Sequence, residues 1–271
     1  MEKIDIATHS KIVELFQTKG WEIDEDNKKS LYNRYLTTLK SLKSEDEKEI
    51  FLTLSNDYRI IDEKDYTNML IEILLEVFTD QSKETVYVYP IELNKSKTKS
   101  GKFLSYLFKS IRLNYMDILH KKEFIVLEEH TDLIKKNLEG KRLLIIDDYV
   151  GSGKQCIRCF DEVFKSIVKS NKYRFDKIKE VNIISLVANI KGKEYIEERI
   201  SKYDNVSFET ALVTGNVSSE YHDMLMKIGI ADKDGSFLGY EDTADLITMV
   251  RTPNNTLPIF RKKASSPFRR R

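Results

Sequence analysis

Two adjacent carboxylates, Asp147 and Asp148, stand between an apolar run and a glycine-rich turn. The apolar run at residues 143–146 is typical of a strand buried on both faces. The turn spans residues 149–153, and apolar residues recur at helical spacing from residue 154 onward. Such a strand, turn and helix N-terminus gathers backbone N–H groups and a helix dipole around one point, which favours a bound phosphate.

The acid pair itself serves a different part of a ligand. Asp147 and Asp148 carry oxygens that accept hydrogen bonds from sugar hydroxyls or hold a metal ion bridged to the ligand. Adjacent acids at the end of a buried strand repel each other, so a binding role is favoured over simple capping of the turn.

Composition narrows the class of protein. The chain has 271 residues, of which 41% are hydrophobic and 33% charged, as in a soluble globular protein with a highly charged surface. No apolar run approaches the ~20 residues that span a bilayer, so we expect no membrane association. The two cysteines, Cys156 and Cys159, give no disulfide framework and predict a cytoplasmic location.

The net charge of +1 hides a gradient along the chain. Residues 1–82 hold 11 Lys/Arg against 18 Asp/Glu, a net charge of −7, whereas residues 83–142 hold 13 against 8, a net charge of +5. Residues 261–271 hold six basic residues and no acid. This basic tail is a candidate for contact with nucleic-acid phosphates, although such tails are often disordered.

The pattern of apolar residues predicts an α/β fold with a mostly parallel sheet flanked by helices. Residues 1–82 form a predicted α-helical N-terminal subdomain, residues 83–260 the α/β domain, and residues 261–271 the basic C-terminal tail. Strands are predicted at residues 85–93, 124–127, 142–148, 181–188, 206–213 and 246–251. Helices alternate with them at residues 103–119, 154–169 and 193–201, so the ligand is expected at the carboxyl ends of the strands.

The Walker A loop is the first motif to compare with the sequence VGSGK at residues 150–154. That motif requires a glycine where this chain has Asp148 and a hydroxyl where it has Gln155. An acid inside the phosphate cradle is the more serious mismatch, so the pattern disfavours a P-loop NTPase.

A closer match covers residues 143–153, read as LLIIDDYVGSG. This segment resembles the phosphoribosyl pyrophosphate (PRPP) binding loop of type I phosphoribosyltransferases. The resemblance implies that Asp147 and Asp148 contact the ribose hydroxyls and, indirectly, a Mg²⁺ ion. The implied phosphate site comprises Gly151, Ser152, Gly153, Lys154 and Gln155.

The order of predicted elements from residue 83 to residue 213 also agrees with that family. The loop after the first strand then corresponds to the pyrophosphate loop, whose candidate residues are Lys95, Lys97, Lys99, Ser100, Gly101 and Lys102. A run of lysines is equally well explained as a solvated basic loop. Gln155 replaces a closing threonine and Lys154 a small or polar residue; these departures bear on turnover more than on ligand binding.

A second resemblance involves TPNNTLPIF at residues 252–260, together with the helical N-terminal part and the Lys-Ser-Gly-Lys loop at residues 99–102. It is similar to divergent phosphoribosyltransferase-like proteins of bacterial anti-phage cassettes, including retron systems. Three hypotheses follow: an enzyme using PRPP or a related ribosyl phosphate with Mg²⁺, a non-catalytic nucleotide sensor, or a component that binds nucleic acid or a reverse transcriptase–nucleic acid complex.

Overall fold

The computed structural model describes residues 5–91, 100–109, 117–170, 175–215 and 243–250, together with residues 221, 225, 253, 256, 257 and 260. Its contacts separate two units. One is the continuous stretch Asp62–Gly215, and the other combines Met1–Ile61 with the described residues of Asn216–Arg271.

The larger unit is built on a five-stranded parallel sheet with the order β3-β2-β4-β5-β6. Its strands are β2 (Glu84–Pro90), β3 (Lys122–Val126), β4 (Arg142–Val150), β5 (Glu180–Asn189) and β6 (Val206–Thr214). After β2 the chain adds β3 at one side of the sheet, and after β4 it adds β5 and then β6 toward the opposite side. The sheet therefore has its topological switch point between β2 and β4, where ligands of such sheets bind.

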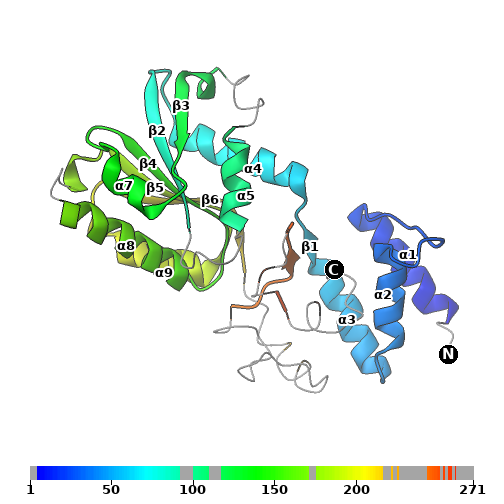
Figure 1. The fold of residues 1–271 in the computed structure, drawn as a ribbon. Helices are drawn as coiled ribbons and strands as arrows, with labels where there is room; N and C mark the ends of the chain where they lie inside the picture. Colours follow the sequence, from blue (N-terminus) through cyan, green and yellow to red (C-terminus); the bar gives the residue numbers. More distant parts are fainter. Residues whose placement is uncertain are drawn as a thin grey trace. The chain divides into compact units, whose positions relative to one another are not determined.

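Helices cover both faces of this sheet (Figure 1). α4 (Glu63–Val77) and α5 (Ser100–Leu107) lie on one face, and α7 (His130–Lys135), α8 (Lys154–Ser170) and α9 (Ile190–Ile200) on the other. Residues 181–189 of β5 are all buried, as expected for a central strand covered on both sides. The predicted α/β fold with a mostly parallel sheet flanked by helices is confirmed.

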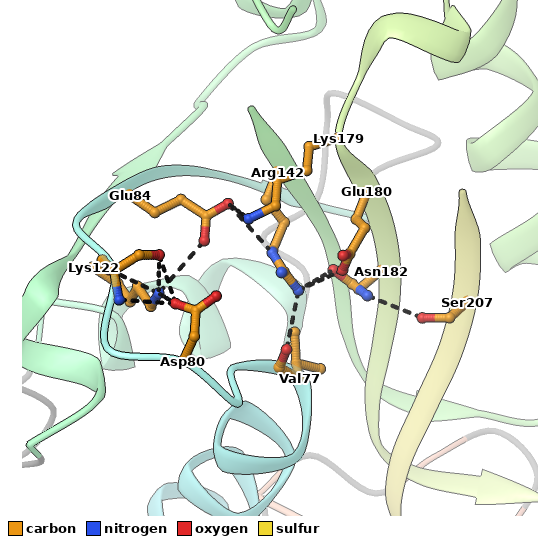
Figure 2. Close-up of polar contacts among 10 residues, drawn as sticks. Val77, Asp80, Glu84, Lys122, Arg142, Lys179, Glu180, Asn182 and Ser207 are labelled. Atoms are coloured by element: carbon orange, nitrogen blue, oxygen red, sulfur yellow. Dashed lines mark hydrogen bonds and ion pairs between the residues drawn. The ribbon is translucent and has the colours of Figure 1, made fainter. Parts of the chain in front are cut away.

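The amino ends of the strands carry a buried ionic network (Figure 2). Glu84, Lys122, Arg142 and Glu180 are the first residues of β2, β3, β4 and β5. Lys122 Nζ and Arg142 Nε each lie 3.6 Å from a carboxylate oxygen of Glu84, and Arg142 Nη1 lies 2.6 Å from Glu180 Oε2. The Phe78 ring lies against both cations, 5.2 Å from Lys122 Nζ and 4.7 Å from Arg142 Cζ.

The smaller unit begins with three helices, α1 (Ile6–Lys19), α2 (Leu31–Lys40) and α3 (Glu45–Asp57). Asp5, Ser30 and Ser44 cap them by accepting backbone N–H groups of the first turns. The short strand β1 (Arg59–Ile60) then pairs in parallel with β7 (Ile247–Thr248). Two 3₁₀ turns, η1 (Leu119–Lys121) and η2 (Phe175–Lys177), complete the described elements of the chain.

The units differ from the predicted domains in two respects. α4, assigned by its sequence to the helical subdomain at residues 1–82, packs on β5 and β6 of the sheet. The described C-terminal residues, assigned to the α/β domain at residues 83–260, join the core of the N-terminal helices: the Phe260 ring lies 4.5 Å from Tyr58 and 5.3 Å from Phe51. Both differences come from apolar side chains whose partners are distant in sequence.

Candidate ligand-binding site

The acid pair lies within β4 and not at its end. β4 pairs with β5 as far as Val150, opposite Ala188, so the turn is reduced to Gly151–Gly153 before α8 begins at Lys154. Adjacent residues of a strand point to opposite faces of the sheet. Asp147 therefore follows Leu143 and Ile145 on the face covered by α8, and Asp148 lies on the face covered by α4.

Asp148 is a buried acid with a defined partner. Its side chain is 4% exposed, and its Oδ2 accepts a hydrogen bond of 2.8 Å from the hydroxyl of Tyr66 in α4. The Tyr66 ring packs edge-on against Phe103 of α5, with the ring centroids 5.7 Å apart. Tyr66 was not among the site residues predicted from the sequence. In the sequence it looks like one of several positions on the apolar face of α4.

Asp147 is half-buried on the opposite face, near the start of α8. Its Oδ1 accepts the backbone N–H of Asp148 at 3.0 Å. The pKa of the nearby Cys156 thiol is raised well above its usual value, first by burial and then by the charges of Cys159 and Asp147. Cys156 and Cys159 are both buried in the core, so they are packing residues.

The turn after β4 is held tightly against the first turn of α9. Gly153 has φ +74°, and a Cβ placed on it would lie 2.7 Å from the carbonyl oxygen of Gly192. A Cβ on Gly192 would lie 1.9 Å from the carbonyl oxygen of Gly151. Both positions therefore require glycine. Gly153 was predicted as a site residue, whereas Gly192 was missed because a single glycine near a helix start carries no specific signal.

The other predicted phosphate residues stand around this turn. Ser152 is half-buried, and the side chains of Lys154 and Gln155 are exposed in the first turn of α8. Backbone N–H groups at the start of a 17-residue helix meet the glycine turn here, which is a suitable environment for an anion. The roles of these residues stay predictions.

The chain leaves β2 next to this site. Ile91 N–H donates to the carbonyl of Ile146 at 2.8 Å, immediately before the acid pair. Of the predicted pyrophosphate residues, Ser100, Gly101 and Lys102 form the first turn of α5, where Lys102 is exposed. Lys95, Lys97 and Lys99 lie outside the described residues. The structure thus brings the start of α5 and the acid pair to the same edge of the sheet, at the switch point.

The acid pair suits Mg²⁺ only as part of a ligand complex. Within the described part of the chain, no group of three or more His, Cys, Asp or Glu residues is placed to hold a metal ion. Asp147 and Asp148 offer the carboxylate oxygens that Mg²⁺ prefers, and Mg²⁺ commonly binds through one or two carboxylates plus substrate phosphates. The carboxylates of Asp147 and Asp148 are therefore suited to a Mg²⁺ ion that is also bound by the phosphates of a ligand.

The described helices include none that is both long and apolar enough to cross a bilayer.

A parallel sheet with a switch point, an acid pair on its central strand and a glycine turn before a helix define a phosphoribosyltransferase-like α/β protein. The family model PRTase-CE matches residues 32–270, and the chain belongs to that family. The resemblance to phosphoribosyltransferases predicted from residues 143–153 is thereby confirmed.

Solved structures similar to the chain include the AQ2163 protein from Aquifex aeolicus, with 13% identity and a TM-score of 0.35 over 73% of this chain and 88% of that one. A hypothetical protein from Neisseria gonorrhoeae with bound ppGpp has 11% identity and a TM-score of 0.35 over 64% and 98%. Orotate phosphoribosyltransferase from Aeropyrum pernix has 16% identity and a TM-score of 0.30 over 61% and 75%. No curated protein sequence matches the chain.

The resemblance to retron-associated proteins stays a prediction. Of residues 252–260, which carry it, the structure describes 253, 256, 257 and 260, and the basic tail at 261–271 lies outside the described residues.

Proposed function

We propose that the chain binds PRPP or a related ribosyl phosphate at the carboxyl edge of its sheet. The observation that carries this proposal is the position of Asp147 and Asp148: they lie on β4, beside the switch point, and only Tyr149 and Val150 separate them from the glycine turn before α8. Few other places in an α/β sheet combine acceptors for sugar hydroxyls with donors for a phosphate.

Each part of the ligand has a candidate partner in this arrangement. The backbone of Gly151, Ser152 and Gly153 binds the 5′-phosphate, and the acid pair orients the ribose. The start of α5 and the basic residues before it attract the pyrophosphate. Mg²⁺, when bound with the ligand, neutralises part of the charge on that leaving group.

Transfer of the ribosyl group to an acceptor is the reaction that the family resemblance favours, and the proposed activity is that of a phosphoribosyltransferase. A second candidate is ligand binding without turnover, as in a nucleotide sensor. It is favoured by one observation: Asp148 is 4% exposed and already accepts a hydrogen bond from Tyr66. One of the two acids is thus already held by a protein group, which suits a site that binds a ligand without turning it over.

Isothermal titration calorimetry with PRPP and Mg²⁺ tests the binding site. Wild type is expected to bind PRPP. Asp147→Asn is expected to bind it at least roughly tenfold more weakly, because the substitution removes a charged acceptor of a ligand hydroxyl. Asp148→Asn is expected to weaken binding in the same direction. The matched control is Asp161→Asn on the exposed face of α8, which should leave the affinity unchanged.

Absence of binding heat from wild type would contradict the proposed site. If wild type binds, release of pyrophosphate in the presence of a panel of nucleobases separates the two candidates. Release that depends on one base supports the transferase, whereas binding without release from any base supports the sensor.

The proposal extends to partners only through the second resemblance. A role in an anti-phage complex, with a reverse transcriptase and its nucleic acid as partners, rests on residues 252–260 and on the basic charge of residues 261–271.

A further inference from the structure

Tyr66 and Asp148 form a buried polar pair that links a helix outside the predicted α/β domain to the ligand site. The two residues are 82 positions apart, and the oxygen–oxygen distance is 2.8 Å. Tyr66 is fully buried and Asp148 is 4% exposed. A hydrogen bond to a charged acceptor in such surroundings is stronger than one at the surface, because water does not compete for either group.

Two sets of contacts fix the position of Tyr66, one at its backbone and one at its ring. Asp62 caps α4 by accepting the N–H groups of Lys64 and Asp65, and Asp65 accepts the N–H of Asp62 in return. This capping box fixes the first turn of α4, in which Tyr66 lies. The ring of Phe103, near the start of α5, contacts the Tyr66 ring at an interplanar angle of 69°.

We propose that Tyr66 is a positioning residue for Asp148, so that α4 forms part of the ligand-binding site. The hydrogen bond to Oδ2 sets the rotation of the Asp148 carboxylate and directs Oδ1 toward the ribose hydroxyls. Through Phe103, the same contact ties this acid to the first turn of α5, where the pyrophosphate is proposed to bind. The inference rests on the proposed function, because it assigns Asp148 a ligand contact.

A purely structural reading of the pair makes a different prediction. A buried carboxylate needs a donor whether or not a ligand binds, and loss of the donor lowers stability. If that were the only role of Tyr66, its hydroxyl would affect unfolding and leave the ligand affinity of the folded protein unchanged. Affinity and stability must therefore be measured on the same variants.

A double-mutant cycle separates these roles. PRPP affinity in the presence of Mg²⁺ is measured for wild type, Tyr66→Phe, Asp148→Asn and the double variant, using millimolar PRPP for the weak binders. Urea unfolding is measured on the same four proteins. Tyr203→Phe is the matched control, since it removes a phenol hydroxyl in the same unit from a ring packed on Phe160 and Phe164, on the opposite face of the sheet.

We expect Tyr66→Phe to weaken PRPP binding roughly tenfold when Asp148 is present and less than about twofold in the Asp148→Asn background. Tyr203→Phe should not change the affinity. Wild-type affinity retained by Tyr66→Phe, or equal losses in both backgrounds, would overturn the positioning role while leaving the proposed function intact. A wild type that binds no PRPP would instead overturn the proposed function, and with it the ligand role of Tyr66.

Discussion

At the scale of single residues, charged side chains are buried at both ends of the sheet, but for different reasons. At the amino ends, Glu84 lies among Lys122, Arg142 and Lys179, with Lys179 Nζ 3.0 Å from Glu84 Oε1. These partners neutralise one another, so the network serves stability. Toward the carboxyl ends, Asp147 and Asp148 are neighbours on β4, where Asp148 accepts a hydrogen bond from Tyr66, and the repulsion between adjacent acids favours a functional role for the pair.

Glu84→Gln is expected to lower the free energy of unfolding by about 3 kcal/mol. The substitution removes a carboxylate that Lys122 and Arg142 share, and leaves the charges of these two side chains, which are 0% and 6% exposed, undercompensated. Chemical denaturation monitored by circular dichroism measures the change. As a control, Glu45→Gln removes the exposed partner of Lys48 and should cost less than about 1 kcal/mol. Equal effects of the two substitutions would contradict the structural role of the network.

At the scale of elements, the glycine turn between β4 and α8 depends on a helix that contributes no predicted site residue. α9 begins after Asn189, whose side chain accepts the N–H of Lys191 at 3.0 Å. That cap sets the start of the helix and places Gly192 directly against Gly151. The shape of the turn at Gly151–Gly153, where we propose that phosphate binds, is therefore decided jointly by β4, α8 and α9.

Gly192→Ala tests this dependence. A methyl group at this position would lie 1.9 Å from the Gly151 carbonyl oxygen, so the turn or the helix must move. We expect a loss of about 1–3 kcal/mol in the free energy of unfolding, although alanine is the better helix former, and a weaker affinity for PRPP. Gly215→Ala is the control, because a Cβ there has no neighbour within 4 Å.

Unchanged PRPP affinity in Gly192→Ala would show that the turn tolerates movement and that α9 does not determine the shape of the binding site.

At the scale of the whole molecule, one unit is continuous and the other is formed by two separate segments of the chain. Asp62–Gly215 contains the full sheet and its core. The core of the other unit combines residues of α1 to α3 with Leu225, Leu257 and Phe260. The predicted boundaries at residues 82 and 260 do not separate these cores.

A fragment of residues 62–215 is expected to fold alone, since its buried apolar cluster lies within it. A fragment of residues 1–61 is expected not to unfold cooperatively, because it lacks the aromatic ring of Phe260 that packs on Phe51 and Tyr58. Thermal melts followed by circular dichroism compare the two. A sharp transition in the 1–61 fragment, or none in the 62–215 fragment, would show that the two units are divided wrongly.

Much of the fold could be predicted because its signals are local. The continuous apolar runs of β4 and β5 predict buried parallel strands, and the change to helical spacing at residue 154 predicts α8. The acid pair and Gly153 were recognisable by type and spacing. The end of β4 was predicted two residues early, at Asp148, because a polar pair usually ends a strand; pairing with β5 carries it on to Val150.

By itself, the sequence determined the class of the fold and the central turn, since both depend on residues close together along the chain. Only the tertiary structure decided the surroundings of that turn. Tyr66 reaches Asp148 across 82 positions, and Gly192 meets Gly151 because α9 returns to the same edge of the sheet. No local pattern encodes such contacts, because they arise when separate elements bury their apolar faces against one another.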